Sequence, residues 1–136
     1  MERDTRNQTQ VLVVDDEQPI RQIVRGILED AGYDVAEAAD GLAALEHMRA
    51  DDTPRVVLLD LRMPRLDGGG VLRAVAGDRA LAGHHALILM TANLPSLTPP
   101  LADLLNQLEV SVLAKPFDLD DLLDTVERAE RRLRRG

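Results

Sequence analysis

Short apolar runs alternate along the chain with longer stretches in which apolar residues recur at helical spacing. The runs lie at residues 10–15, 34–38, 55–60, 86–91 and 110–114. Between and after them, apolar residues recur every three or four positions, as they do on one face of a helix. This alternation is typical of βαβ units, so the sequence predicts an α/β fold in which five parallel strands alternate with five helices.

The predicted helices differ in how clearly their ends are marked. Pro19 suits the first turn of the first helix, which stops at Ala31-Gly32, and Asp118 is a candidate cap for the last one. The second helix is expected over about residues 41–51. Gly69 and Gly70 are poor helix formers, so we expect the third helix to start late or fray. The apolar faces comprise Ile20, Ile23, Val24, Ile27 and Leu28; Leu42, Leu45 and Met48; Val71, Leu72 and Val75; Leu101, Leu104, Leu105 and Leu108; and Leu119, Leu122, Leu123, Val126, Ala129 and Leu133.

Four of the runs end at residues that can take part in phosphoryl chemistry. These residues are Asp15, Asp16, Asp60, Thr91 and Lys115. The carboxyl ends of parallel strands lie at one edge of the sheet, where open α/β sheets bind ligands. We therefore expect three carboxylates, one hydroxyl and one amine to meet in one crevice. Lys115 is the only lysine beside fifteen arginines, which indicates that a compact ammonium is needed at this position.

The residue types suggest a role for each member of this set. The adjacent carboxylates of Asp15 and Asp16 repel each other unless a cation joins them, and Mg²⁺ prefers such oxygen ligands. Asp60 ends a run that is apolar on both faces and is the best candidate for a carboxylate nucleophile. Thr91 and Lys115 would then hold phosphoryl oxygens. Taken singly, these residues are more often part of a turn, a helix cap or a loop, so the hypothesis depends on their joint occurrence at strand ends.

Length and composition limit the class of protein. At 136 residues without cysteine, the chain is expected to form one domain with neither disulfides nor thiolate metal sites. We expect residues 1–9 to be a flexible N-terminus, residues 10–130 to form the domain, and residues 131–136 to be the basic end of the last helix. No stretch approaches the roughly 20 apolar residues of a membrane span, which favours a cytoplasmic protein that does not bind membranes.

The formal net charge of −8 is unevenly distributed. Residues 128–136 contain five arginines and one glutamate, so residues 1–127 carry a net charge of −12. This negative charge disfavours nucleic-acid binding by the body of the protein. The basic segment is typical of a solvated helix end that complements the helix dipole, rather than of a phosphate-binding arm.

Five segments of the chain resemble, in order, the signatures of the response regulator receiver domain. They read VLVVDDEQPIRQIV, AGYDVAEAADGLAALEHM, VVLLDLRMPRLDGGGVL, LILMTA and VLAKPF. The resemblance covers about residues 10–130. It implies a flavodoxin-like, doubly wound sheet of five parallel strands in the order 2-1-3-4-5, with helices on both faces.

By this resemblance, Asp60 accepts a phosphoryl group from a histidine kinase or a histidine phosphotransfer protein. Asp16 and Asp60 would bind Mg²⁺ directly, Asp15 would act through water, and the backbone carbonyl of Arg62 would be a further ligand. The protein would then be a signalling switch and not an enzyme, apart from self-catalysed phosphorylation and dephosphorylation. Its downstream partner is a protein that the sequence does not identify, and a weak homodimer is a further candidate assembly.

The same resemblance assigns the switch to Thr91, whose hydroxyl would move toward the phosphoryl group, with Lys115 as its cationic partner. The peptide bond before Pro116 is expected to be cis. One feature departs from the family, because Val112 occupies the position where an aromatic residue usually changes rotamer with the threonine. Leu108-Glu109 replaces a pair of small residues, and the segment LPSLTPP is unusually rich in proline.

Several positions leave alternatives open. Arg62 and Asn93 would flank the phosphoryl group, and Arg62 is either an ordinary surface residue or a cover over the acyl phosphate. His84 and His85 suggest a metal or phosphohistidine site, but we expect them in a loop at the opposite edge of the sheet.

Two other classes of protein also fit parts of the pattern. A haloacid-dehalogenase-like phosphatase uses similar groups, but its nucleophile lies on the first strand and its acidic pair comes last. The chain would alternatively be a receiver fragment of a longer transcription factor or sensor, with its basic end starting a linker.

Overall fold

Five parallel strands form one sheet in the order β2-β1-β3-β4-β5, as the resemblance implied. The computed structural model describes residues 9–92 and 98–135, so the predicted flexible segment 1–9 lies outside the described residues except for Thr9. The strands are β1 (Gln10–Val14), β2 (Asp34–Ala38), β3 (Arg55–Asp60), β4 (Ala86–Thr91) and β5 (Ser111–Ala114). Each begins and ends within one residue of its predicted bounds.

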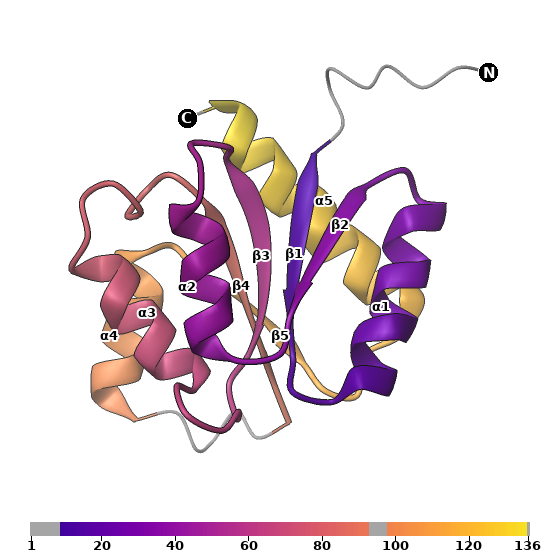
Figure 1. Ribbon diagram of the computed structural model, residues 1–136. Coiled ribbons are helices and arrows are strands. Elements are labelled where there is room, and N and C mark those ends of the chain that lie inside the picture. The colour runs from indigo at the N-terminus through magenta and orange to yellow at the C-terminus, as the bar shows by residue number, and fades with distance from the viewer. Residues whose placement is uncertain (1–8, 93–97, 136) are drawn as a thin grey trace.

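Helices cover both faces of the sheet (Figure 1). They are α1 (Gln18–Asp30), α2 (Gly41–Arg49), α3 (Gly68–Ala76), α4 (Pro99–Gln107) and α5 (Leu119–Arg135). Helices α1 and α5 pack on one face, whereas α2, α3 and α4 pack on the other. Within the described ranges, no helix has the length and apolar composition needed to cross a membrane.

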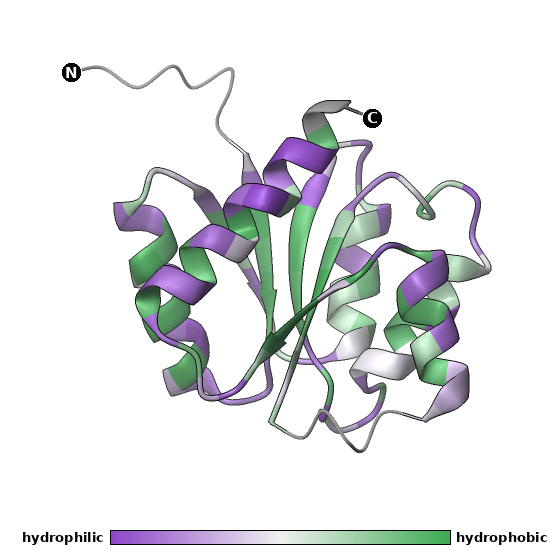
Figure 2. Ribbon diagram, turned by 180° about the vertical axis from the view of Figure 1, so that it is seen from behind, coloured by the Kyte–Doolittle hydropathy of each residue, from purple (hydrophilic) through white to green (hydrophobic). Residues whose placement is uncertain are grey.

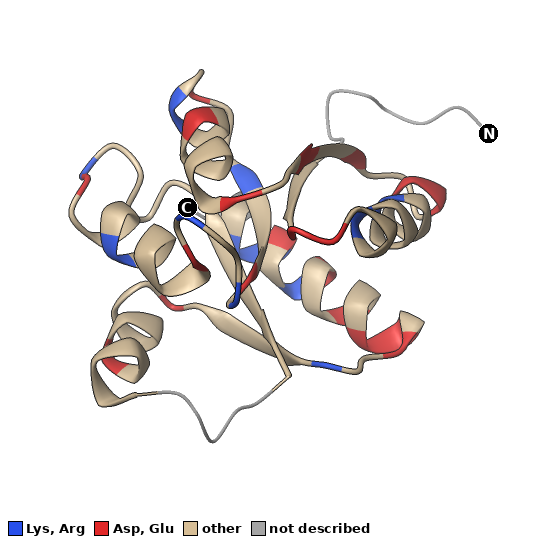
Figure 3. Cartoon of the chain, turned by 60° about the horizontal axis from the view of Figure 1, so that its bottom comes forward, with Lys and Arg blue, Asp and Glu red and all other residues tan. Residues whose placement is uncertain are grey.

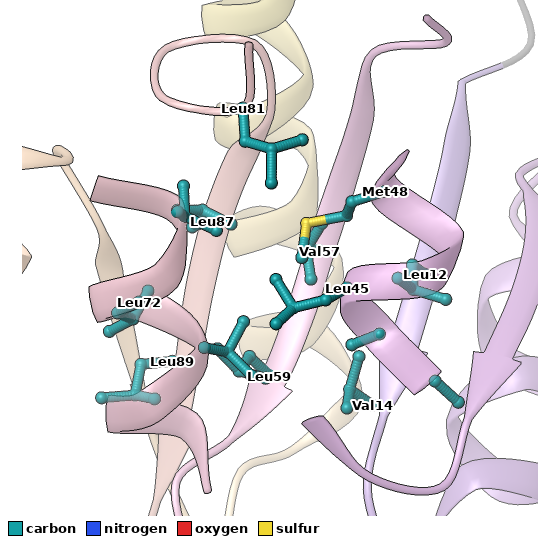
Figure 4. Packing of buried hydrophobic residues seen from close by; sticks show 14 of the residues in the cluster. Leu12, Val14, Leu45, Met48, Val57, Leu59, Leu72, Leu81, Leu87 and Leu89 are labelled. Carbon is teal, nitrogen blue, oxygen red and sulfur yellow. The ribbon is translucent and has the colours of Figure 1, made fainter. Parts of the chain in front are cut away.

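The central strands are buried on both faces because two helical layers cover them. All six residues of β3 and all six of β4 are buried. Alternate residues of β3 pack into separate clusters: Val57 and Leu59 lie under α2 and α3, and Val56 and Leu58 under α1 and α5. Figure 4 shows the first cluster, and Figure 2 shows apolar strands between helices whose outer faces are polar.

Three apolar positions that were predicted to face the core are exposed instead. Ile23, Leu42 and Leu119 have relative exposures of 61%, 50% and 51%. Helix α2 begins at Gly41 and turns Ala44 and Leu45 toward the sheet. Leu42 lies beside that face, because successive residues are rotated by about 100° around a helix. Periodicity found the helices and most of their buried faces, but it misplaced one residue in each of α1, α2 and α5.

The expected late start of α3 is wrong. The helix begins at Gly68 and includes both Gly69 and Gly70, with the Asp67 side chain accepting a hydrogen bond from the Gly70 amide at 2.8 Å. A Cβ atom at Gly68 would lie 2.7 Å from the carbonyl oxygen of Asp60. Glycine is therefore needed where this helix packs closely against the end of β3, and the cap offsets its low helix propensity.

The start of α2 is in close contact with the loop that precedes α3. The Gly41 amide donates to the Leu66 carbonyl oxygen at 3.2 Å, and a Cβ atom at Gly41 would lie 2.3 Å from that oxygen. Asp40 caps α2 by accepting from the Ala43 amide at 2.8 Å, and its other carboxylate oxygen lies 3.3 Å from Arg65 Nη1. The loop after β3 is therefore attached to a neighbouring helix.

His84 and His85 lie at the amino ends of the strands, at the edge opposite to Asp60, as expected. His85 is only 6% exposed, and its Nδ1 accepts a hydrogen bond from the Arg55 amide at 3.1 Å. Burial, together with the smaller effects of the charges of His84 and Arg55, lowers the pKa of His85 to about 4. The ring is therefore neutral near pH 7.

We expect His85 to make the fold sensitive to acid. Its pKa is about 4 in the folded chain against an ordinary value of 6.5, so the stability that it contributes is complete above about pH 6.5. This contribution is lost as the pH falls toward 4, and at about pH 5 the loss is about 2 kcal/mol. Urea unfolding across this pH range measures the effect. In His85→Asn, whose side-chain oxygen can accept from the Arg55 amide, the decline should be shallower. An equal decline in both proteins would contradict this role.

Candidate functional site

The carboxyl ends of four strands bring the predicted residues together at one edge of the sheet, which Figure 3 turns toward the viewer. Asp60 and Thr91 are the last residues of β3 and β4, whereas Asp15 and Lys115 directly follow β1 and β5. A pocket of about 530 Å³ opens here, lined by Asp16, Glu17, Asp60, Leu61, Arg62, Thr91, Ala92 and Lys115.

Lys115 bridges two of the carboxylates. Its Nζ lies 3.3 Å from Asp15 Oδ2 and 3.3 Å from Asp60 Oδ1. Burial by itself would lower the pKa of Lys115, but the charges and hydrogen bonds of Asp60 and Asp15 together raise it, so the ammonium stays protonated. The Lys115 amide donates to the Thr91 carbonyl oxygen at 2.8 Å, and the peptide bond to Pro116 is cis, as expected.

Asp60 has an energetically costly charge. Burial raises the pKa of its carboxyl, and the neighbouring charges of Asp15 and Asp16 raise it further, while Lys115 acts in the opposite direction. The single ammonium does not fully compensate the burial and the two like charges. A further positive charge beside this cluster would favour the ionised form of Asp60.

The adjacent aspartates have different environments. Asp15 is fully buried, and its Oδ1 accepts a hydrogen bond from the Glu17 amide at 2.9 Å, whereas Asp16 is exposed. One carboxylate oxygen from each of Asp15, Asp16 and Asp60 lies within 4.8 Å of the others. A donor set made only of carboxylate oxygens, beside a pocket with room for water, suits a hard divalent cation such as Mg²⁺.

Two of the remaining predicted positions line the same pocket. Arg62 is exposed and lines the pocket, and Thr91 is buried at its wall. Asn93 lies outside the described residues. Val112 is 37% exposed on β5. The two aromatic residues of the chain, Tyr33 and Phe117, pack against the apolar core under α1 and α5. Neither of these aromatic residues takes the place of Val112 on β5.

One side chain that contacts the site outside the pocket, that of Arg21, was not predicted from the sequence. Arg21 Nη1 donates to the carbonyl oxygen of Asp15 at 2.7 Å, and Arg21 Nε lies 3.0 Å from Glu37 Oε1. The available signal was an acidic residue within the short predicted strand 34–38, because a half-buried carboxylate requires a cationic partner. The sequence did not indicate which of the many arginines supplies it.

Comparisons with known proteins agree with this geometry. Residues 11–127 match the sequence profile of the response regulator receiver domain. Response regulator MprA of Mycobacterium tuberculosis is 38% identical over 122 residues, which span 90% of this chain and 50% of the relative. The C4-dicarboxylate transport transcriptional regulatory protein DctD of Pseudomonas aeruginosa is 37% identical over 90% of this chain and 25% of its own length. The chain therefore spans half or less of these curated relatives.

Solved structures of receiver-domain proteins also resemble this chain. A CheY-like response regulator receiver domain protein from Methanospirillum hungatei superposes with a TM-score of 0.83 at 28% identity, covering 94% of this chain and 98% of that one. The chemotaxis protein CheY4 of Vibrio cholerae superposes with a TM-score of 0.76 at 31% identity, covering 90% of this chain and 98% of that one. Both likenesses extend over nearly the whole sheet and its helices.

Proposed function

Because the chain belongs to the response regulator receiver domain family of two-component signalling proteins, we propose that it accepts a phosphoryl group on Asp60. The observation that carries the proposal is the Lys115 ammonium, 3.3 Å from the carboxylates of both Asp60 and Asp15 in the strand-end pocket. This arrangement supports the proposal, because a candidate nucleophile, a positive charge and space for a phosphoryl group then lie together. The donor is a histidine kinase or a histidine phosphotransfer protein.

The transfer exchanges one bond to phosphorus for another. An oxygen of Asp60 attacks phosphorus while the bond from phosphorus to the donor breaks, and the bonding electron pair leaves with the donor's imidazole nitrogen. Asp60 then carries an acyl phosphate. Lys115 offsets the negative charge on the phosphoryl oxygens, because its Nζ already lies 3.3 Å from Asp60 Oδ1.

The acidic cluster fits Mg²⁺, which would be held by Asp16, Asp60 and the backbone carbonyl of Arg62, with Asp15 acting through water. When bound, the ion would supply additional positive charge to the phosphoryl oxygens. Asp15 also contacts Lys115. Its Oδ2 accepts a hydrogen bond from Lys115 Nζ, and its Oδ1 accepts one from the Glu17 amide. Asp15 therefore orients the ammonium.

Signalling would follow from the charge added at Asp60. Lys115 is bonded through its backbone to β4 at Thr91, so a shift of the ammonium toward the phosphoryl group reaches both strands. The Thr91 hydroxyl lies at the same wall and is the second group that would respond. Because Val112 replaces the usual aromatic residue on β5, we propose that the response is passed on to a downstream protein without an aromatic rotamer change.

Incubation with acetyl phosphate and Mg²⁺ tests the proposal. We expect one phosphoryl group per chain, stable in acid, labile in base and located by mass spectrometry on the peptide that contains Asp60. Acetate leaves in place of imidazole, so no partner protein is required. Absence of labelling contradicts the proposal, and turnover of a generic phosphate ester with release of free phosphate would indicate a phosphatase instead.

We expect Arg62 to prolong the life of the acyl phosphate. Its exposed guanidinium lines the pocket beside Asp60 and can donate to phosphoryl oxygens, restricting the approach of water. Arg62→Ala should therefore lose the phosphoryl group between about two and ten times faster. The measurement is the decay of labelled protein after removal of the donor. Arg65→Ala is the matched control, because Arg65 is in the same loop but pairs with Asp40. Equal decay in the native protein and Arg62→Ala would refute this role.

A further inference from the structure

Arg21 connects three elements behind the acidic cluster. It belongs to the first turn of α1, its side chain is only 14% exposed, and it does not line the strand-end pocket. Its Nη1 donates to the backbone carbonyl of Asp15 at 2.7 Å, and its Nε is 3.0 Å from Glu37 on β2. The guanidinium therefore holds the β1–α1 loop by its backbone and is itself held by the neighbouring strand.

With this contact, all polar groups of Asp15 have hydrogen-bond partners. The Asp15 amide donates to the Ala38 carbonyl oxygen at 3.2 Å, and its carboxylate oxygens are held by the Glu17 amide and by Lys115. Its carbonyl oxygen accepts from Arg21. Every polar group of Asp15 is thus occupied, and the plane of the peptide that joins it to Asp16 is set by Arg21.

The orientation of the Asp16 side chain depends on the plane of this peptide more than the orientation of the Asp15 side chain does. Asp16 is exposed, and across the described parts of the chain its carboxylate has no hydrogen-bond or ion-pair partner that would orient it. Its oxygen nevertheless lies within 4.8 Å of oxygens from Asp15 and Asp60. The direction of the side chain therefore depends on the backbone at Asp16, which includes the peptide that joins it to Asp15.

We propose that Arg21 is a positioning residue that orients Asp16 toward the cation site by fixing the Asp15–Asp16 peptide. The inference rests on the proposed function in one respect, namely that the cluster binds Mg²⁺. Partners that orient metal ligands from outside the coordination shell typically affect metal affinity by about ten- to a hundredfold. Arg21 would change Mg²⁺ affinity by holding the backbone carbonyl of Asp15, and not by contacting the side chain of a metal ligand.

The direction in which Mg²⁺ affinity changes distinguishes a positioning role of Arg21 from a purely electrostatic one. Removing a positive charge near a cation site strengthens cation binding by simple electrostatics. Removing a residue that orients a ligand weakens cation binding. Arg21→Gln should therefore bind Mg²⁺ about tenfold or more weakly if the residue positions Asp16, and more tightly if it acts only as a charge.

Arg25 supplies a matched control. Arg25 Nη1 lies 2.7 Å from the other carboxylate oxygen of Glu37, so Arg25→Gln also removes one positive charge and one ion pair from Glu37. It has no contact with the carbonyl of Asp15. Mg²⁺ titration of the full chain, followed by calorimetry and amide chemical shifts, should show unchanged or slightly tighter binding for Arg25→Gln. Equal weakening in both variants would overturn the proposal.

A second measurement needs no metal. In the Mg²⁺-free protein, Arg21→Gln should shift the carbonyl carbon resonance of Asp15 and speed hydrogen exchange of the Glu17 amide, which is bonded to Asp15 Oδ1. Arg25→Gln should change neither. If the native protein fails to bind Mg²⁺, the metal part of the proposed function fails, while these signals still test the contact of Arg21. Unchanged Asp15 and Glu17 signals in folded Arg21→Gln overturn the inference.

Should Arg21→Gln fail to fold, Glu37→Gln serves instead. This variant weakens the attachment of Arg21 to β2 and leaves the arginine itself in place. It should shift the Asp15 carbonyl resonance in the same direction as expected for Arg21→Gln, by a smaller amount. This resonance is the readout for Glu37→Gln, because removing the negative charge of Glu37 weakens Mg²⁺ binding by electrostatics alone. An unaltered Asp15 resonance in Glu37→Gln overturns the proposal in that case.

Discussion

Asp60→Asn should abolish phosphorylation by acetyl phosphate. Asparagine has nearly the shape of aspartate, but its neutral amide is a far weaker nucleophile and does not form an acyl phosphate. Lys115 keeps its contact with Asp15 Oδ2, so the pocket should remain assembled. Intact-mass measurement of phosphoryl incorporation in the presence of Mg²⁺ should therefore detect none in the variant.

Asp103→Asn is the control for this experiment. Asp103 is exposed on α4, away from the strand-end pocket, so its replacement should leave labelling at the native level. Circular dichroism of both variants establishes that they are folded. Full labelling of Asp60→Asn would show that another carboxylate accepts the phosphoryl group, and the assignment of Asp60 would be wrong.

Gly41→Ala should destabilise the fold by about 3 kcal/mol, at the upper end of the usual cost of overpacking. Its added Cβ would lie 2.3 Å from the Leu66 carbonyl oxygen and 2.8 Å from Val71 Cγ2, and the first of these atoms belongs to the backbone and cannot rotate away. The start of α2 and the loop after β3 would have to separate, breaking the Gly41 to Leu66 hydrogen bond. The free energy of unfolding in urea measures the effect.

Gly26→Ala is the opposite case. Gly26 lies within α1 with nothing within 4 Å of an added Cβ. Alanine there should stabilise the fold by about 0.5–1 kcal/mol, because it favours helix and restricts the unfolded chain. A similar change in stability for the two variants would contradict the close contact between Gly41 and Leu66.

Much of this fold follows from features that are local in sequence. Strand β3 is apolar at successive positions because helical layers cover both of its faces, so its extent is visible without a structure. Asp60 and Thr91 stand out because each is a polar residue at the end of such a strand. The convergence of these strand ends follows from parallel pairing alone.

Other features depend on contacts between distant segments. The exposure of Leu42 is set by how α2 rotates on the sheet, and the need for glycine at Gly68 arises from the end of β3. The contact of Arg21 with the Asp15 carbonyl joins a side chain to a backbone group, which leaves no residue-type pattern. Sequence therefore indicated the groups proposed to react but not the residues that orient them.

During synthesis, β1 emerges first but becomes an interior strand, so it acquires both of its neighbours only when β3 has been made. By then Asp15 and Asp60 can already lie at the same edge, while Lys115 is still 55 residues beyond Asp60 in the chain. A partial sheet β2-β1-β3 formed at that stage would hold these two carboxylates with no ammonium between them. Strand β5, the last strand to be synthesised, is directly followed by the only lysine, so the late part of the chain supplies positive charge that offsets part of the negative charge held by the early part.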